Sequence, residues 1–390
     1  MHSSSAPAKL SSKSDASMME VLMISPSYPA DLADWRGLFI RYLAEALARH
    51  EQIRLRLWSP PGEIPGNAMH IASPQESRWL AWLMAQGGIA HIIRHGGMRG
   101  LISPLRLLRM LAAVYRRHSS MDIYHINWLQ CALPLPRNGK PALIAVLGND
   151  MKLLRLPFMK ALLRRTIRDR KVAICPNADW MQAPLADAFG DLAEVQAVSF
   201  GIDPSWYRIH RDLSRDRRKW LAVTRLTLDK LGPLFEWSEA LFRDGMRELH
   251  LFGPMQENIN IPEWIHYHGS ATPEQLANTW FPSAQGLITL SRHAEGRPQV
   301  MLEAMAAGLP IIASRTLAHA SMVDEGVTGR MCDSLEDYTD ALRQLDESAI
   351  NLRFGENARA WAAREIGTWD DCANRYTQIY RRLLGRAEDG

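Results

Sequence analysis

A stretch near residue 300 combines two carboxylates with the features of an anion-binding helix start. It covers residues 286–310 and places Glu295 in a polar loop, with Glu303 eight positions later. Pro298 suits the first turn of a helix, and Gly308 suits the left-handed position that closes one. The N–H groups at such a helix start, beside the positive end of its dipole, favour a phosphate or diphosphate. The segment expected to form this start is Arg297, Pro298, Gln299 and Val300.

The two carboxylates need partners other than a phosphate, because like charges repel. Carboxylate oxygens accept hydrogen bonds from hydroxyl groups, so sugar or ribose hydroxyls would suit Glu295 and Glu303. Spacing alone also permits a plainer interpretation. In that case Glu295 is a helix-start acid and Glu303 a solvated surface residue.

An alternation of strand and helix patterns predicts the scaffold. Short apolar runs typical of buried parallel strands occur in both halves of the chain, and helical spacing, as in residues 38–47, separates most of them. The expected strands are residues 21–25, 53–58, 123–126, 142–147, 172–175, 220–223, 249–252, 265–267, 286–290 and 310–313. A break around residues 201–218 divides them. The pattern predicts an α/β protein with two doubly wound, Rossmann-like domains and an active site in the cleft between them.

Composition agrees with two soluble-type domains. The chain has 390 residues, of which 47% are hydrophobic and 23% charged, and it lacks an apolar run of the roughly 20 residues that span a bilayer. Residues 1–18 are predicted to be a disordered tail, because they are rich in Ser, Ala and Lys without an apolar core. Four scattered cysteines favour reduced thiols and a cytoplasmic location.

Positive charge gathers in the first half, although the net charge is only +4. Seven arginines and no acidic residue lie between Glu76 and Asp122, and residues 152–171 form a second basic block. This asymmetry points to an anionic partner. Within residues 89–118 an apolar row and a basic row recur at helical spacing: Leu101, Leu105, Leu108 and Ala112, and Arg106, Arg109, Arg116 and Arg117. Such a segment suits an anionic membrane surface, and it equally suits a domain helix with its arginines in water.

Residues 295–310 read E-G-R-P-Q-V-M-L-E-A-M-A-A-G-L-P and resemble the E-x7-E signature of glycosyltransferase family 4 and related GT-B retaining enzymes. Residues 223–230 (V-T-R-L-T-L-D-K) are similar to the Arg…Lys motif that opens the second domain of that family, with Leu231 before the usual Gly. Residues 200–203 (F-G-I-D) resemble the linker between its domains. Residues 361–384 resemble the C-terminal helices that cross back to the first domain.

This resemblance implies a GT-B division of labour. Residues 19–200, completed by a C-terminal helix at 369–388, would form the acceptor domain, and residues 201–368 the nucleotide-sugar donor domain. Glu295 would bind hydroxyls of the donor sugar and Glu303 those of the ribose. Arg225 and Lys230 would contact the donor diphosphate. Three further positions would line the nucleotide or approach its phosphates: Gly37, Gly253 and His268.

One segment departs from the family pattern. Residues 147–150 read L-G-N-D, so Leu147 stands where the family often has a histidine near the transferred sugar. Asp150 becomes a candidate for a substrate contact. His125 resembles part of a histidine-containing strand end and is expected to face the cleft. A histidine at a strand end is also commonly a structural hydrogen-bonding residue.

The resemblance implies retention of anomeric configuration without a metal or cofactor, and the chain contains no D-x-D motif. The donor would be a UDP- or GDP-sugar. We expect a lipid-linked or glycan acceptor of the cell envelope or an exopolysaccharide, reached from the cytoplasmic membrane face. A soluble small-molecule acceptor, or a catalytically impaired sugar- or nucleotide-binding relative, is the alternative. Nucleic acid is not an expected partner, because the chain contains no recognised nucleic-acid module.

Overall fold

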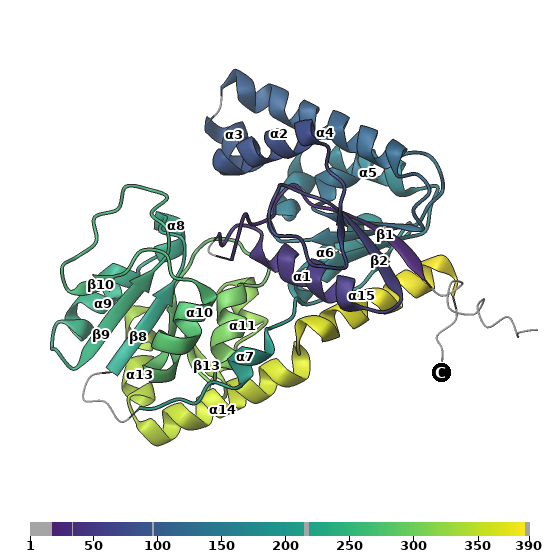
Figure 1. Ribbon diagram of the computed structural model, residues 1–390. Helices are drawn as coiled ribbons and strands as arrows, with labels where there is room; N and C mark the ends of the chain where they lie inside the picture. The colour runs from purple at the N-terminus through teal and green to yellow at the C-terminus, as the bar shows by residue number, and fades with distance from the viewer. Residues whose placement is uncertain (1–17, 33, 96, 214–217, 387–390) are drawn as a thin grey trace, which may run out of the picture.

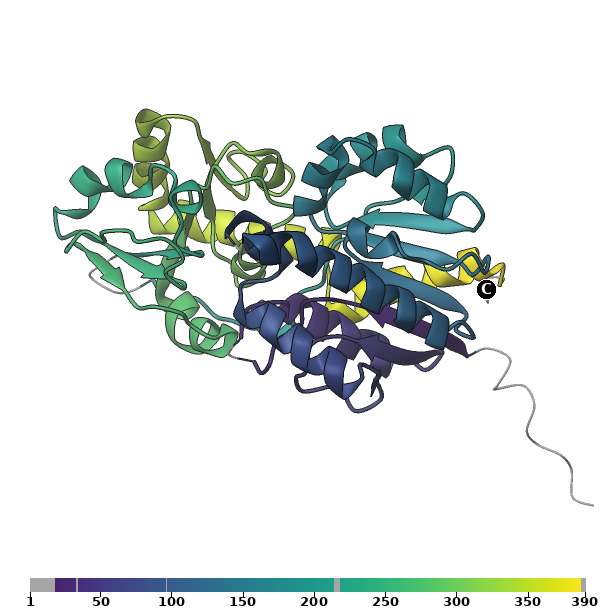
Figure 2. The same cartoon turned by 90° about the horizontal axis from the view of Figure 1, so that it is seen from above.

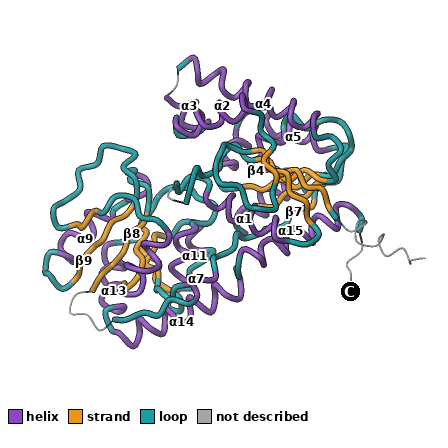
Figure 3. The backbone as a smooth tube through the Cα atoms, in the orientation of Figure 1, coloured by secondary structure: helices purple, strands orange, loops and turns teal. Residues whose placement is uncertain are grey.

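The computed structural model describes residues 18–32, 34–95, 97–213 and 218–386. Two parallel β-sheets lie in separate domains, with helices on both faces of each (Figures 1 and 3). The first sheet contains β1 (Met19–Ile24), β2 (Ile53–Trp58), β3 (Met69–His70), β4 (Ile123–Asn127), β5 (Ala142–Val146), β6 (Val172–Pro176) and β7 (Glu194–Val195). The second contains β8 (Arg218–Val223), β9 (Arg247–Phe252), β10 (Ile265–Tyr267), β11 (Ala284–Thr289), β12 (Ile311–Ser314) and β13 (Gly329–Cys332).

The order of strands is the same in both sheets apart from one added edge strand. The first sheet runs β3-β2-β1-β4-β5-β6-β7 and the second runs β10-β9-β8-β11-β12-β13. In each sheet the order reverses direction at one neighbouring pair, β1 with β4 and β8 with β11. Ligands of doubly wound sheets bind beyond the carboxyl ends of the strands at such a pair. The prediction of two Rossmann-like doubly wound domains is therefore confirmed.

Each strand predicted from an apolar run is present, with ends that differ from the predicted ones by at most two residues. The central strands β4, β5 and β6 are buried along their whole length, which explains why they are recognisable as continuous apolar runs. The sequence missed β3, β7 and β13. The first two contain two residues each, and β13 has an arginine and a glycine among its four.

Helices of the first domain are α1 (Leu38–Arg49), α2 (Pro74–Ala85), α3 (Ile89–His95), α4 (Met98–Arg117), α5 (Met159–Ile167) and α6 (Gln182–Phe189), with 3-10 segments η1 (Leu129–Ala132), η2 (Asn149–Arg155) and η3 (Asp179–Met181). After the linker come α7 (Pro204–Tyr207), α8 (Leu228–Leu231), α9 (Leu234–Phe242), α10 (Pro273–Gln275), η4 (Leu276–Trp280), η5 (Phe281–Ser283), α11 (Gln299–Ala306), α12 (Leu317–Ala320), α13 (Leu335–Leu345) and α14 (Ser348–Glu365).

The last helix, α15 (Trp369–Leu384), returns to the first domain (Figures 1 and 2, yellow). It begins with a capping box in which Thr368 and Asp371 exchange hydrogen bonds with each other's backbone N–H. Its buried residues, among them Trp369, Tyr376 and Tyr380, belong to the same core as β1, β2 and α1. The core of the first domain thus contains residues from both ends of the described chain.

Helix α4 presents a different face to the core from the one predicted. Leu107, Leu111 and Val114 are buried, whereas Leu105 is 57% exposed. The sequence offers two apolar rows on this helix, and packing against the sheet selects the row that starts at Leu107. Among the described residues, no helix is long and apolar enough to cross a membrane. The predicted disordered tail covers residues 1–18, and all of it except residue 18 lies outside the described residues.

Candidate active site

Two loops of the second domain bring Arg225, Lys230 and Glu295 together at the pair of strands where the sheet order reverses. Arg225 and Lys230 follow β8, and Glu295 follows β11. Lys230 Nζ forms an ion pair with Glu295 Oε1, and their side chains are only 10% and 18% exposed. A hydrogen bond of 2.8 Å from Arg292 N to Asp229 O fastens the two loops to each other. The site predicted from two separate motifs is thus one constellation in space.

This constellation is positively charged, apart from Glu295. Burial lowers the pKa of Lys230, and the charge of Glu295 opposes that shift. The pKa of His293 is lowered by burial and then by the charge of Lys230, with smaller contributions from Lys152 and Arg225. Lys152 belongs to the first domain, so cations from both domains surround His293. Such a group favours a diphosphate.

His293 and Lys152 were not among the predicted site residues. His293 lies two positions before Glu295, in the loop of residues 290–298 between β11 and α11, which we call the motif loop. Its position in that loop was the signal from which it could have been predicted. Lys152 was noted only as part of a basic block, and its proximity to the second domain requires the tertiary structure.

A second set of polar contacts joins the motif loop to the end of β12 and to α12. Ser314 Oγ donates to Ser291 O at 2.6 Å, and His319 Nδ1 lies 2.8 Å from Ser314 O. The backbone N–H of His293 donates to Ser291 Oγ at 3.1 Å. His319 is almost completely buried. These contacts fix the path of the loop that carries Glu295.

Helix α11 starts one residue later than expected. Pro298 occupies the N-cap, α11 begins at Gln299, and Gly308 adopts the predicted left-handed conformation (φ 79°) after its end. The N–H groups of Gln299 and Val300 belong to the first turn, where an α-helix leaves its N–H groups without intrahelical partners. The Val300 side chain packs against the second-domain core.

The side chains of Arg297 and Gln299 reach the first domain and the linker. Arg297 forms an ion pair of 2.7 Å with Asp179 and a hydrogen bond to Ser199 Oγ, and its side chain is only 4% exposed. Gln299 Nε2 donates to Gly201 O at 2.9 Å. Both residues were predicted to bind the donor. Their side chains have an interdomain role, which the sequence did not predict, and the expected donor contact of their backbone N–H groups stays a prediction.

The loop between Glu295 and Arg297 rests directly on the first domain. Trp180 Nε1 donates to Gly296 O at 2.9 Å. A Cβ at Gly148 would lie 2.4 Å from Gly296 N, so only glycine permits this approach. The motif loop and the carboxyl end of β5 are therefore in contact across the two domains.

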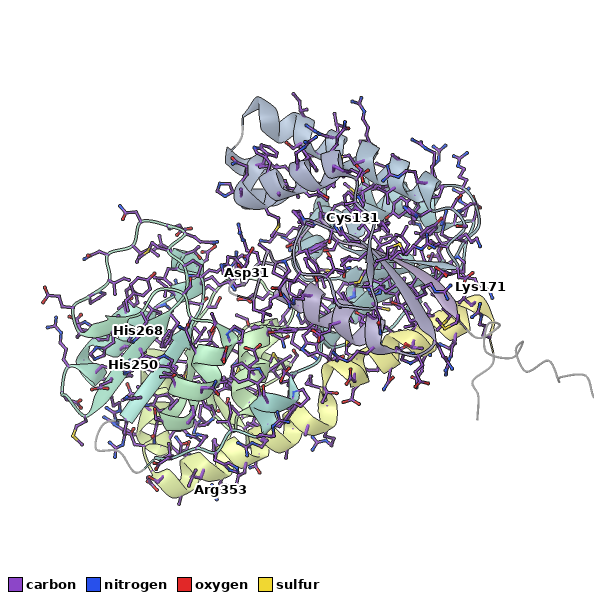
Figure 4. All side chains as sticks on the ribbon, in the orientation of Figure 1. Asp31, Cys131, Lys171, His250, His268 and Arg353 are labelled. Atoms are coloured by element: carbon purple, nitrogen blue, oxygen red, sulfur yellow. The ribbon has the colours of Figure 1, made fainter. Side chains whose placement is uncertain are left out.

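The loop after β1, in the first domain, contacts Arg225. The guanidinium of Arg225 lies 5.5 Å from the ring centroid of Trp35, a cation–π contact between the domains. Asp31 of the same loop is labelled in Figure 4 between the two domains. Gly37 has φ 74°, and a Cβ there would lie 2.8 Å from Ser27 Oγ. The turn into α1 therefore requires glycine on structural grounds alone.

Glu303 lies on α11 with a carboxyl group that resists ionisation. Burial, and then the negative charge of Asp203, raise its pKa to about 8. Gly253, after β9, has φ 135°, and a Cβ there would meet Thr224 O at 1.7 Å. Gly253 thus allows β8 and β9 to end side by side.

His268 lies in an aromatic stack on the second sheet. Its Nε2 is 3.0 Å from His250 Nδ1, and its ring centroid is 4.5 Å from that of Trp280. Figure 4 labels His250, on β9, and His268, which directly follows β10. Burial lowers the pKa of His268, and the nearby His266 lowers it further.

The prediction that His125 faces the cleft is wrong. His125 is completely buried near the middle of β4, where its Nδ1 pairs with Tyr380 Oη of α15 and its ring packs on Tyr376. Burial lowers its pKa to about 3, so the ring is neutral. Side chains alternate along a strand, and the side that carries His125 is the side that α15 covers.

Asp150 is also turned inward, which excludes the predicted direct substrate contact in this arrangement. It is 2% exposed and accepts a hydrogen bond of 2.9 Å from Leu147 N. Burial raises its pKa to about 7. Its carboxyl group stabilises the turn after β5, which is the turn that contacts Gly296.

Among the described residues, no group of His, Cys, Asp or Glu has the arrangement of a metal site.

Comparisons with known proteins agree with this geometry. Residues 236–348 match the family described as "Glycosyl transferases group 1". A GDP-mannose-dependent alpha-(1-6)-phosphatidylinositol monomannoside mannosyltransferase of Mycobacterium tuberculosis is 23% identical, over 93% of this chain and 98% of its own. A D-inositol 3-phosphate glycosyltransferase of Corynebacterium jeikeium is 28% identical over 36% of this chain, and the match spans about a third (33%) of that relative. The structure of Anabaena HepE in complex with UDP superposes with a TM-score of 0.66 at 12% identity, covering 94% of this chain and 100% of the other.

Together, the two doubly wound sheets and these similarities define a protein of the GT-B class. Within that class, the second domain carries the region that matches the group 1 glycosyl transferases, and the chain is similar to enzymes of glycosyltransferase family 4.

Proposed function

We propose that the protein transfers a sugar from a UDP- or GDP-sugar to an acceptor, with retention of anomeric configuration and without a metal ion. The observation that carries the proposal is the contact between Lys230 and Glu295, with Arg225 beside them, at the strand pair where doubly wound sheets bind ligands. Two motifs that are 65 residues apart meet there. The named relatives that act with GDP-mannose or bind UDP support a nucleotide-linked donor.

The residues suggest a division of chemical work. Arg225 and Lys230 would stabilise the negative charge that develops on the diphosphate as its bond to the sugar breaks. The first turn of α11 would add N–H donors and a helix dipole. Glu295 would accept hydrogen bonds from sugar hydroxyls, and Glu303 from the ribose.

Retention would follow from attack on the face that the diphosphate leaves. The acceptor oxygen forms the new bond to the anomeric carbon as the bond to the diphosphate oxygen breaks, and the acceptor proton passes to that phosphate oxygen. The described residues near Glu295 that carry charge are mainly cations, which suits this ion-pair-like step better than a covalent one.

A lipid-linked acceptor at the cytoplasmic membrane face is the acceptor class that we favour. The mycobacterial relative is named for a phosphatidylinositol glycolipid acceptor. Basic residues are concentrated in the first domain, which would bind the acceptor. The product would belong to the cell envelope or to an exopolysaccharide.

A panel of UDP- and GDP-sugars tests the proposal, with release of free nucleotide as the readout and lipid-linked or soluble acceptors added in parallel. We expect release that depends on one donor and on an acceptor, that is unchanged by EDTA, and that yields the donor's anomeric configuration by NMR. A strict requirement for Mg²⁺ or Mn²⁺ would contradict the metal-independent proposal. Nucleotide binding without turnover by any pair would favour the catalytically impaired alternative.

A further inference from the structure

Three exposed apolar side chains cluster between η2 and α5 in the first domain. Phe158 is 81% exposed, Leu156 is 50% exposed and Leu162 is 49% exposed. Leu162 follows Phe158 by four residues, and its N–H donates to Phe158 O at 2.9 Å, so both lie on one side of the first turn of α5. We call these three residues the Phe158 surface. An aromatic ring left so open to water is unfavourable in an isolated protein.

The backbone at Phe158 adds a second unusual feature. Phe158 caps α5 in the left-handed conformation, with φ 64° and ψ −13°. Only one other non-glycine residue among those described, Trp128, has a positive φ. A bulky side chain rarely adopts this conformation, which glycine or asparagine would adopt more easily. The backbone is therefore in a strained conformation at Phe158, whose ring is the most exposed aromatic ring among the described residues.

Three exposed cations lie near the Phe158 surface in the sequence. Arg155, Lys160 and Arg165 are all exposed, and Arg165 follows Phe158 by seven residues, on the same side of α5. Leu163 and Ile167 hold the opposite side of α5 in the core. Exposed apolar side chains with cations beside them in the chain complement the interface of an anionic bilayer, where aromatic rings enter the headgroup region and cations meet lipid phosphates.

One short segment of the chain joins the Phe158 surface to the candidate active site. The 3-10 segment η2 leads to it directly from Gly148, which contacts Gly296 of the motif loop. Lys152, in the middle of that segment, lowers the pKa of His293. Phe158 thus follows, three residues after the end of η2, a segment that contacts the motif loop at Gly148.

Helix α4, the segment first expected to face a membrane, is a weaker candidate. Arg117 pairs with Glu76 at 2.9 Å, and the guanidinium of Arg106 lies 5.2 Å from the ring centroid of Trp79. Two of the four arginines of the expected basic row are therefore engaged within the first domain.

We propose that Phe158, Leu156 and Leu162 insert into an anionic lipid bilayer, with Arg155, Lys160 and Arg165 on lipid phosphates, and that this docking presents a lipid-linked acceptor to the site. The inference rests on the proposed function for the acceptor and adds the surface that reaches it. The Phe158 surface is one face of the first domain and takes no part in the chemistry at Glu295.

Co-sedimentation of the full chain with liposomes tests it, using phosphatidylcholine vesicles with and without phosphatidylglycerol. Phe158→Gly is the main variant, because glycine relieves the left-handed backbone and keeps the helix cap. The triple variant Arg155→Gln, Lys160→Gln, Arg165→Gln removes the charge. Matched controls are Leu352→Gln and the triple variant Arg243→Gln, Arg343→Gln, Arg353→Gln. These residues are exposed in the second domain, where Figure 4 labels Arg353 at the far end.

We expect binding that requires phosphatidylglycerol and weakens with salt. Phe158→Gly should lower the partition coefficient by roughly tenfold or more, without lowering the melting temperature. At low salt, the charge variant should bind only as strongly as the wild type binds at high salt. Both controls should match the wild type. Nucleotide release with a detergent-dispersed acceptor, measured in parallel, should be the same for wild type and Phe158→Gly.

Results of two kinds would overturn the inference. One is equal binding of wild type and Phe158→Gly, or no binding of the wild type to anionic vesicles. The other is a dimer in solution that Phe158→Gly converts to a monomer, which would assign the surface to a second copy of the chain. The parallel measurement of nucleotide release separates these results from a failure of the proposed function, which would abolish release in every variant.

Discussion

Glu295 and Lys230 neutralise each other in a place largely shielded from water, which makes the pair sensitive to the loss of either member. We predict that Glu295→Ala abolishes transfer while the chain remains folded, because the residue lies in a loop and not in a core. Glu295→Gln keeps the shape and tests the charge. Circular dichroism and thermal melting check the fold, and nucleotide release checks transfer. Near-normal turnover by a folded Glu295→Ala variant would remove this residue from the mechanism.

Arg225 and Lys230 should act on the transition state. Losing one preorganised contact to developing charge typically costs about 3–4 kcal/mol, so Arg225→Ala or Lys230→Ala should lower kcat by two to three orders of magnitude, roughly. Steady-state kinetics separate kcat from KM, and Arg243→Ala, an exposed arginine of the same domain, is the control. If both variants raised KM alone, the two cations would hold the donor without assisting the departure of the diphosphate.

Glu303 should make stability depend on pH. Its pKa is raised from 4.5 to about 8, so the folded state keeps a proton that the unfolded state has lost. Between these values, stability therefore falls as pH rises. Chemical denaturation at pH 6 and at pH 9 should show a smaller pH effect in Glu303→Gln than in the wild type. Part of the effect should persist, because Asp150, with a pKa of about 7, acts in the same direction. An unchanged pH dependence in Glu303→Gln would contradict the raised pKa.

At the scale of elements, η3 and the motif loop before α11 hold the two domains together. Asp179, Trp180 and Gly148 contact the loop from the first domain, and Arg297 reaches back to Asp179. The position of Glu295 is thus set by both sheets. A displacement of about 1 Å at a reacting group lowers rates by roughly a hundredfold.

We accordingly predict that Asp179→Asn lowers kcat about tenfold to a hundredfold, with little change in nucleotide affinity. Asp191→Asn is the matched control, because Asp191 pairs with Arg164 within the first domain and is similarly exposed. A double-mutant cycle of Asp179→Asn with Arg297→Gln, read as kcat, should show that the two changes are not additive. Additive effects would mean that the ion pair does not position the loop.

At the scale of the whole molecule, the last helix completes the first domain. Tyr380 of α15 pairs with His125 of β4, and both are fully buried. Tyr380→Phe should therefore cost about 1–3 kcal/mol of unfolding free energy, because it leaves the His125 ring nitrogen buried without its partner. Urea denaturation measures this cost. Tyr376→Phe is the control on the same helix: the Tyr376 hydroxyl is buried without a hydrogen bond, so its removal should be neutral or stabilising. A larger loss in Tyr376→Phe than in Tyr380→Phe would refute this account.

The sequence by itself determined the elements and the second-domain motifs. Strands such as β5 and β6 are buried on both faces, so their apolar runs are visible without knowledge of the neighbours. The end of α11 at Gly308 follows from the local backbone conformation that glycine favours. Arg225, Lys230 and Glu295 were predicted as site residues through the resemblance of residues 223–230 and 295–310 to family motifs. Both motifs follow a recognisable strand, and the carboxyl ends of parallel strands share one edge of the sheet.

Only the tertiary structure decided which side of each element is buried and which residues its side chains contact. His125 sits under α15, a helix that starts 244 residues later, so nothing near it in the chain revealed its burial. Arg297 belongs to the donor motif, yet its partner Asp179 lies in the other domain. Helix α4 carries two apolar rows, and the sheet selected one. Phe158 was part of a basic block, and its exposure emerged only when α5 packed Leu163 and Ile167 inward. The local spacing of apolar residues determines whether a segment forms a helix or a strand. Which element packs against each side of it depends on contacts between residues that are distant in sequence.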